Sequence, residues 1–424
     1  MVLQDLSMFI QARIMMYLLK PNKNVRRLGS LQLMLLFISV MGFGQYDPYL
    51  SGRAYMHAGM YDSAQFHLER ALEQNPGSSD LYYQLGVAHF TLKNYPDARD
   101  AFYETEKRRK GMGSFYLAKS EIRLSHPQQA LKYLRTHLSS RYKKSESEIL
   151  LDEDISTLDG MPGWQELWNE KRWYNSRDKE FQDAMFLKSQ GDYLEAINML
   201  NKLEKQGYKT SVVESEKAAI YQELGNTKAS RSALKSAVKS DARNLDALQQ
   251  LALMQLTDGD AEEAVEGLNK VIRQDPARFE AYMQRAEAQS QVGDLSAALS
   301  DMELYLAYFP ENDSAIYRKG LIQFEHGLYL DAMQSFNRSL ALDKSKAEYY
   351  FARGRTYAAT GTTRYAEKDM SMALDLDPLN GDIWYEKAKL ADQLGNIESA
   401  CYCYQKAFQY GIYEAGEEVN KRCK

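Results

Sequence analysis

The chain has 424 residues, of which 44% are hydrophobic and 26% are charged, so it can build a hydrophobic core and is not a disordered polyanion. Its net charge of −5 gives no indication of nucleic-acid binding, and 3 cysteines are too few for a disulfide scaffold or a four-cysteine zinc module. The 25 glycines and 9 prolines exclude the collagen-like and proline-rich classes. The composition therefore indicates a mostly helical protein with many tyrosines.

Residues 1–44 differ from the rest of the chain. A basic stretch at 20–27 precedes an apolar run at 28–44. This order is typical of a secretory signal, and the run is short for a membrane span, which needs about 20 apolar residues. We expect this segment to be a signal peptide that is cleaved at its end, with Met15 or Met16 as an alternative start. A retained N-terminal anchor is the other interpretation.

A period of 34 residues runs through the rest of the chain. Glycines recur at this spacing, namely Gly191, Gly225, Gly259, Gly293, Gly327, Gly361 and Gly395. A small residue lies 7 positions before each glycine, and a large apolar residue lies 9 positions after it. This spacing predicts two helices per unit. Glycine ends the first helix because a left-handed C-cap costs it little, and the small residue lets a neighbouring helix approach closely.

The pattern resembles the tetratricopeptide repeat family, whose units are helix pairs of this length. The resemblance implies an all-α fold, a right-handed α-solenoid of about ten helix–turn–helix repeats. We expect a three-unit array at 45–144, a seven-unit array at 177–412 and a cap helix at 413–424. Lys93 and Ser125 stand where glycine is usual, so looser turns are expected there.

Residues 145–176 break the rhythm and are expected to form a joint between the arrays. Acidic residues are followed there by tryptophans, in the order Asp152, Asp154, Asp159, Trp164, Trp168 and Trp173. The acidic cluster lacks the glycine and the terminal glutamate of an EF-hand, so we expect a solvated loop and no calcium site. The tryptophans, on a short helix, either pack on a neighbouring unit or form a knob that binds a partner.

The chain carries no recognisable catalytic motif. It has no phosphate-binding loop, no dinucleotide fingerprint, no HExxH and no GxSxG elbow. We therefore expect a protein that is not an enzyme, with no catalytic residue, no cofactor and no metal site. Cys401 and Cys403 are two residues apart on a predicted helix and so face different directions. In an exported protein either could form a disulfide with Cys423, and free thiols are the alternative.

The fifth residue of the unit is aromatic in seven of ten units, against 12% aromatic residues overall. These seven are Tyr49, Tyr83, Phe115, Phe181, Tyr317, Phe351 and Tyr385. The stripe is similar to the lining of the concave surface in the family, which implies a groove for a protein or peptide. Phe324, Arg355 and Lys389 add apolar and basic groups to the last three units, which favours an acidic segment. Alternatively, the rings are core between neighbouring first helices.

These features favour a scaffold that binds a partner protein in its groove. We expect no nucleic acid and no small-molecule substrate, and membrane contact only through the N-terminal segment. The sequence Phe43-Gly44-Gln45 resembles the signal endings of Bacteroidota, so we expect an exported protein in the periplasm or at the outer membrane. The alternatives are an envelope enzyme, or an accessory to one, that uses the solenoid as a scaffold, and a cytosolic adaptor of the same family.

Overall fold

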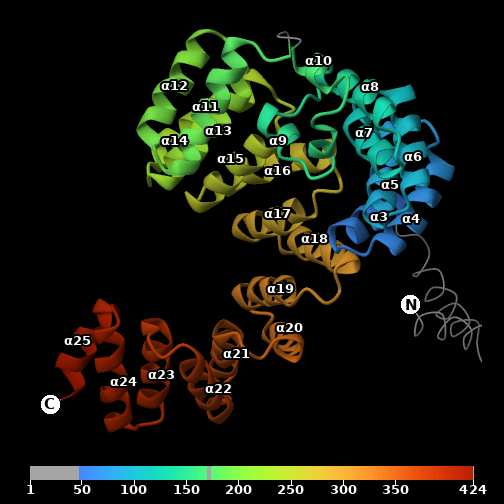
Figure 1. The fold of residues 1–424 in the computed structure, drawn as a ribbon. Helices are drawn as coiled ribbons and strands as arrows, with labels where there is room; N and C mark the ends of the chain where they lie inside the picture. Colours follow the sequence, from blue (N-terminus) through green and yellow to red (C-terminus); the bar gives the residue numbers. More distant parts are fainter. Residues whose placement is uncertain (1–46, 170–172, 424) are drawn as a thin grey trace, which may run out of the picture. The chain divides into compact units, whose positions relative to one another are not determined.

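The computed structural model describes residues 47–169 and 173–423, and within these ranges the chain forms helices and no strands (Figure 1). The predicted signal peptide lies outside the described residues. None of the helices in this part of the chain combines the length and apolarity that crossing a membrane requires.

Consecutive helices pair into hairpins, three before the joint and seven after it. The N-terminal hairpins are built of α3 (Pro48–His57), α4 (Tyr61–Gln74), α5 (Ser79–Thr91), α6 (Tyr95–Arg108), α7 (Ser114–Arg123) and α8 (Pro127–Leu138). The first helices of the other seven are α11 (Ser176–Gln190), α13 (Thr210–Glu223), α15 (Leu245–Thr257), α17 (Phe279–Val292), α19 (Asp313–Glu325), α21 (Ala347–Ala359) and α23 (Gly381–Gln393). Their second helices are α12 (Tyr193–Lys205), α14 (Thr227–Ser240), α16 (Ala261–Gln274), α18 (Leu295–Tyr308), α20 (Tyr329–Leu342), α22 (Thr363–Leu376) and α24 (Ile397–Gln409). The prediction of an all-α solenoid of helical hairpins is confirmed.

Three short helices form the joint, and one helix follows the last hairpin. The joint contains α9 (Glu146–Leu150), the 3-10 helix η1 (Ile155–Leu158) and α10 (Trp164–Asn169). Helix α25 (Tyr413–Arg422) packs on α24.

The turns within the hairpins share one backbone conformation. All seven glycines of the 34-residue series have positive φ, between 68° and 91°. Lys93 and Ser125 adopt the same left-handed conformation, with φ of 64° and 65°. The Asn94 N–H donates to the His89 carbonyl at 2.8 Å, which is the bond that Asp260 makes to Gln255 after a glycine turn. The expectation of looser turns is therefore wrong, because this hydrogen bond holds the same turn geometry without glycine.

The hairpins are held by close approach of their two helices. A Cβ atom added at Gly320 would lie 2.6 Å from the ring of Phe336, and one at Gly86 would lie 2.7 Å from the ring of Phe102. Both phenylalanines are fully buried. The small residue of the first helix therefore makes room for the large residue of the second, as the sequence pattern predicts.

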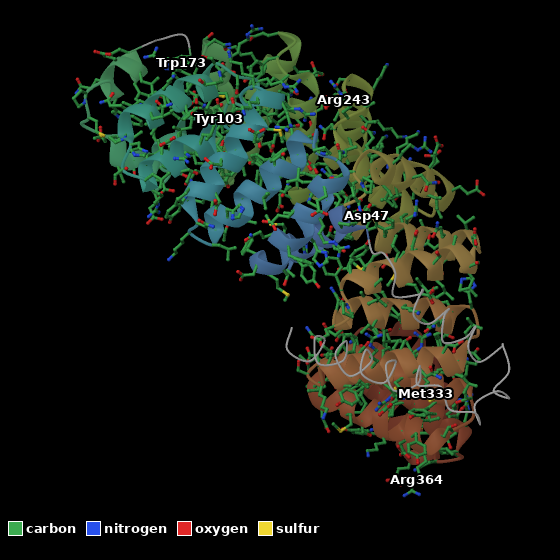
Figure 2. The ribbon with its side chains drawn as sticks, turned by 90° about the vertical axis from the view of Figure 1, so that its right-hand side faces the viewer. Asp47, Tyr103, Trp173, Arg243, Met333 and Arg364 are labelled. Carbon is green, nitrogen blue, oxygen red and sulfur yellow. A yellow bond between two sulfur atoms is a disulfide. The ribbon has the colours of Figure 1, made fainter. Side chains whose placement is uncertain are left out.

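The tryptophans of the joint pack on the preceding hairpin. Trp164 and Trp173 are 6% and 5% exposed, and they share one buried cluster with Leu131 and Leu134 of α8. Trp168 meets Trp164 edge-on, with 5.5 Å between ring centroids. Figure 2 shows the side chains of the described residues, with Trp173 labelled beside the helices that precede the joint. The structure supports the packing interpretation and not a protruding knob.

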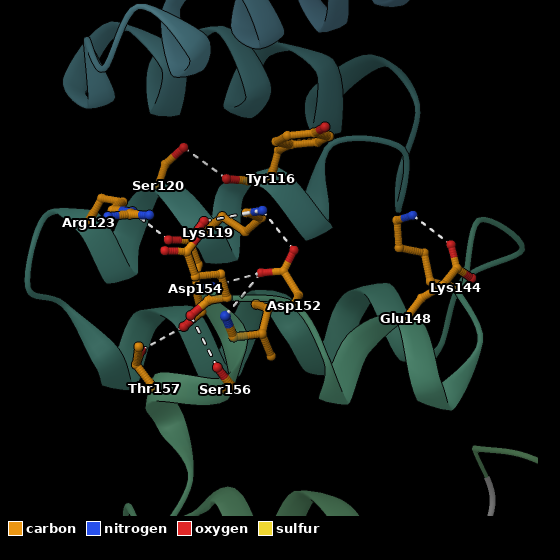
Figure 3. A network of polar contacts seen from close by, with 12 residues as sticks. Tyr116, Lys119, Ser120, Arg123, Lys144, Glu148, Asp152, Asp154, Ser156 and Thr157 are labelled. Carbon is orange, nitrogen blue, oxygen red and sulfur yellow. Dashed lines mark hydrogen bonds and ion pairs between the residues drawn. The ribbon is translucent and has the colours of Figure 1, made fainter.

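Two of the three acidic residues of the joint, Asp152 and Asp154, are not solvated as expected, whereas Asp159 is exposed. Lys119 of α7 reaches both carboxylates, with Nζ 2.7 Å from Asp152 and 3.2 Å from Asp154 (Figure 3). Arg123, one helical turn further along α7, pairs with Asp154, which is only 4% exposed. The expectation failed because the partner cations lie in a different hairpin, which the local sequence does not reveal. The network fastens the joint to α7.

The first hairpin also contacts a helix pair that is distant in the sequence. The Nε2 atom of His57 lies 3.0 Å from a carboxylate oxygen of Glu280, and its ring meets Phe309 at 5.5 Å between centroids. Ala54 belongs to the same buried cluster as Phe279. Stacking of nearest neighbours alone does not generate this contact between α3 and the α17–α18 hairpin.

Replacing Lys93 with glycine is expected to stabilise the protein. A left-handed residue other than glycine costs roughly 1–2 kcal/mol, and the greater freedom of glycine in the unfolded chain offsets about half of that. The gain in free energy of unfolding should be about 0.5–1 kcal/mol, measured by urea denaturation. Gly259→Ala is the matched control, because φ is 88° there and nothing lies within 4 Å of an added Cβ. Gly259→Ala should lower the free energy of unfolding by a similar amount. A lower free energy of unfolding in Lys93→Gly would contradict the prediction.

Gly320→Ala and Gly354→Ala are expected to differ in sign. Alanine gains about 1 kcal/mol of helix propensity at either site. At Gly320 the new methyl group overlaps the buried ring of Phe336, and overpacking costs about 1–3 kcal/mol, so a net loss of up to about 2 kcal/mol is expected. At Gly354 the nearest atoms lie at 3.3 Å, so its stability should stay constant or rise slightly. Thermal unfolding of both variants would test this, and equal shifts would contradict it.

His137 of α8 should make the fold sensitive to acid. It is 2% exposed, and burial lowers the pKa of its imidazole to about 4. The Lys144 N–H donates to its Nε2 at 3.1 Å, which suits the neutral ring. As pH falls from 6.5 toward 4, His137 binds a proton in the unfolded chain before it does so in the folded protein, because an unfolded histidine has a pKa of about 6.5. Stability is therefore present above pH 6.5 and is lost as pH falls toward 4, by about 3 kcal/mol at most.

The matching experiment compares pH profiles of urea denaturation. His137→Gln should flatten the fall in stability between pH 6.5 and 4, whatever its effect at neutral pH. His326→Gln, at a half-buried site in another hairpin, should keep the slope of the parent protein. An unchanged slope in His137→Gln would show that groups other than His137 cause the acid sensitivity.

Candidate functional site

The seven aromatic residues at the fifth place of the unit serve hairpin packing with part of their surface. Phe115 is buried, 6% exposed. The others are half-buried, namely Tyr49, Tyr83, Phe181, Tyr317, Phe351 and Tyr385. Rings of this kind lie between neighbouring helices and still present one edge to solvent.

Tyr317 illustrates this packing. Its ring lies 4.7 Å from that of Tyr349 in the next hairpin and 5.8 Å from that of Phe336, measured between centroids. Burial raises the pKa of the Tyr317 hydroxyl. Tyr385 likewise meets Tyr404 at 5.8 Å. These tyrosines stabilise the interface between and within hairpins, so their substitution would disturb folding as well as binding.

A hollow of 270 Å³ lies along the first helices of the last three hairpins, α19, α21 and α23. We call it the C-terminal groove. The residues that line it are Phe324, Arg355, Ala358, Ala359, Glu386, Lys389, Leu390 and Gln393. Each of the three helices contributes lining residues to the groove. Residues three or four positions apart on one helix lie on the same face, so each helix presents one such face to the groove.

The C-terminal groove contains three of the predicted site residues. Phe324, Arg355 and Lys389 line it, whereas Tyr317 and Tyr385 do not. Glu386, Leu390 and Gln393 complete the wall of α23, and the sequence analysis missed them. They follow one another at spacings of four and three residues, which places them on one face of the helix, and this is the signal that could have identified them.

The charged groups of the C-terminal groove are oriented by aromatic rings. The guanidinium carbon of Arg355 lies 4.9 Å from the ring centroid of Phe324 and 5.8 Å from that of Phe351. Lys389 lies over Tyr385 at 5.6 Å, and its Nζ is 2.9 Å from Glu386. The side chain of Lys389 is 45% exposed, so its pair with Glu386 contributes little to stability. The groove thus offers two cations, one carboxylate and an apolar floor.

A larger hollow of 750 Å³ lies where the joint meets the first C-terminal hairpin. We call it the joint pocket. Among the predicted site residues, Phe181 lines it, together with Tyr208, Lys143 and Lys209. Tyr208 donates to Asp178 at 2.6 Å, and both lysines lie within 3.6 Å of that carboxylate. Burial raises the pKa of Asp178, but these partners outweigh it, so the pKa lies below its ordinary value.

Tyr49, Tyr83 and Phe115 line neither of these two hollows. Tyr49 instead accepts a hydrogen bond from Arg53 at 2.8 Å, and burial raises its pKa to about 12. Tyr83 packs on Phe102 at 5.7 Å between centroids. In these N-terminal hairpins the rings of the aromatic stripe therefore take part in packing.

The structure links Cys401 to Cys423 by a disulfide, which connects the end of α25 to α24. Cys403 is buried and free. The alternative of three free thiols is therefore wrong. Across residues 47–169 and 173–423 no group of three or more potential metal ligands is found.

Known protein families match several parts of the chain. Residues 49–112, 283–347 and 381–410 match tetratricopeptide repeat families, and residues 219–311 match the bacterial transcriptional activator domain. No catalytic family is indicated by these matches. A comparison with curated proteins finds no match.

A solved structure shares the fold over part of the chain. A tetratricopeptide repeat protein from Parabacteroides merdae superposes with a TM-score of 0.52 and 17% identity, over 59% of this chain and 99% of that one. The C-terminal part of a repeat protein from Cytophaga hutchinsonii gives a TM-score of 0.43 at 19% identity, over 55% of this chain and 95% of that one. The helical hairpins, the left-handed turns and the first of these likenesses show that the chain has the fold of a tetratricopeptide repeat solenoid, and three stretches of it match that family.

Proposed function

We propose that the protein is a non-enzymatic scaffold that holds a segment of a partner protein in the C-terminal groove. The observation that carries this proposal is the hollow that α19, α21 and α23 line together, with exposed cations beside an apolar floor. Three consecutive first helices offer a surface long enough for several residues of an extended or helical peptide.

The chemistry of the C-terminal groove selects the segment. Arg355 and Lys389 favour carboxylates on the partner, and Phe324 with Leu390 favours an apolar side chain between them. Glu386 takes part of the charge of Lys389, which leaves Arg355 as the stronger site for a carboxylate. Such a centre, with an arginine held against an aromatic ring, is typical of residues that dominate binding energy. The proposed ligand is therefore an acidic segment with an apolar anchor.

We also propose that the protein acts in the cell envelope, in the periplasm or at the outer membrane. Two features support this location. The basic and apolar order of residues 20–44 is typical of a secretory signal. The disulfide between Cys401 and Cys423 belongs to the chemistry of oxidising compartments.

In vivo photo-crosslinking is expected to capture the partner from the C-terminal groove. A photoreactive residue at Ala358, inside the groove, should form a specific crosslink that mass spectrometry identifies, and the complex should be found in the envelope fraction. The same residue at Ala341, exposed on α20, is the matched control and should not form it. Equal crosslinks from both positions would contradict the groove, and a cytosolic complex would contradict the location.

A charge-reversal pair then tests the chemistry of the captured segment. Arg355→Glu with Lys389→Glu should weaken binding of the crosslinked peptide at least tenfold, because two attractive charges become repulsive. Both side chains are exposed, so circular dichroism and thermal unfolding should not change. Arg364→Glu with Lys368→Glu, exposed on α22, makes the same change in net charge and should leave affinity within twofold. Equal losses in the two pairs would point to a non-specific charge effect.

A further inference from the structure

A third hollow, of 650 Å³, lies far along the chain from the C-terminal groove, where α6 and α8 end. We call it the basic pocket. Four cations line it, Arg109, Lys110, Arg135 and Arg141. Its other lining residues are the hydroxyl residues Thr136, Ser139 and Ser140, so no carboxylate is among the described residues that form its wall. The basic pocket uses neither the aromatic stripe nor the residues of the groove.

The two turns that carry these cations are fixed against each other. Glu106 accepts hydrogen bonds from the backbone N–H groups of Gly111 at 2.9 Å and Gly113 at 2.7 Å. Gly111 has a φ of 89°, and an added Cβ would lie 2.2 Å from the Cβ of Ser140. Ser140 in turn donates to the His137 carbonyl at 2.8 Å. The basic pocket is therefore built by ordered backbone contacts, and only glycine fits at the closest approach.

Three of the four cations in the basic pocket are not neutralised by a carboxylate of the described residues. The preceding cations, Lys107 and Arg108, both pair with Glu104 at 2.6 Å. In contrast, no carboxylate of the described residues pairs with Arg109, Lys110 or Arg141. Arg141 makes its polar contact to the Tyr142 hydroxyl, at 2.7 Å.

Helix dipoles account for only part of these cations. The C-terminus of a helix carries roughly half a negative charge, so the ends of α6 and α8 together supply about one. Three unpaired cations exceed this by about two charges. These side chains are exposed and solvated, so they need no fixed partner, but a doubly charged anion in the pocket would match the surplus and be attracted by all three.

The donor geometry favours a phosphate group. Thr136, Ser139 and Ser140 give their hydroxyl hydrogens to backbone carbonyls, so the donors toward a ligand are the guanidinium and ammonium groups. These come from two separate turns, one after α6 and one after α8. A tetrahedral phosphate presents oxygens in all directions and carries a charge of about −1.5 to −2 at pH 7, whereas a carboxylate presents two oxygens in one plane and one charge.

We propose that the basic pocket is a binding site for a phosphate-bearing ligand, either a soluble phosphate compound or the headgroup of a phosphomonoester lipid. Arg109, Lys110 and Arg141 bind its oxygens, and the fixed turns hold these side chains at the rim. The site is independent of the proposed groove and would exist whether or not the groove binds a partner.

Isothermal titration of the full chain with inorganic pyrophosphate tests the site. Binding should weaken as salt is raised and should fall at least tenfold in Arg109→Glu with Lys110→Glu. Lys132→Glu with Lys179→Glu, at exposed positions outside the pocket, makes the same change in net charge and should keep the affinity. Absence of binding by the parent protein at physiological salt, or equal losses in both pairs, would overturn the proposal.

Two further ligands distinguish a lipid headgroup from a soluble phosphate compound, and a phosphate group from carboxylates. Vesicles of phosphatidic acid in phosphatidylcholine should bind if the ligand is a lipid headgroup, and only pyrophosphate should bind if it is soluble; either result supports the site. A glutamate peptide of the same charge as pyrophosphate should bind at least tenfold more weakly. Equal affinity for that peptide would overturn the assignment to phosphate and point to an acidic polypeptide instead.

Discussion

The contact of a small residue with a large one, inside each helical hairpin, is the constraint on which the rest of the structure depends. Where Gly320 faces Phe336, and Gly86 faces Phe102, no atom could be added between the helices without overlap. Such contacts fix the distance between the two helices and bury the large side chain completely. One hairpin alone cannot cover its apolar face, so each stacks on the next, and the 34-residue period becomes a solenoid.

This architecture determines where sites can form. Stacking buries the sides of both helices that meet neighbouring helices, which explains why Tyr317 and Tyr385 are half-buried. Sites can form on the sides of the helices that face solvent and at the turns between hairpins. The C-terminal groove uses the first of these surfaces, with Arg355 held against Phe324. The basic pocket uses the second, where two turns meet at Gly111.

The joint shows how an irregular segment is fixed in a repeat protein. It has no repeat partner of its own, so it is fastened by side chains instead. Trp164 and Trp173 enter the core of the preceding hairpin, and Asp152 and Asp154 pair with cations of α7. Burying Asp154 would be costly alone, and Lys119 with Arg123 compensates its charge.

The sequence by itself determined the hairpins, because their signals are local: a glycine for the left-handed turn, and small and large residues at fixed spacing. It also indicated Phe324, Arg355 and Lys389, since residues on one face of regularly stacked helices must lie together. Only the tertiary structure decided which aromatic rings are core, that Lys119 reaches Asp152, and that His57 meets Glu280. It alone brought Arg109 and Arg141 into one pocket, which the net charge of the chain conceals. Such contacts join residues from different units or turns, and no periodic pattern encodes their distance.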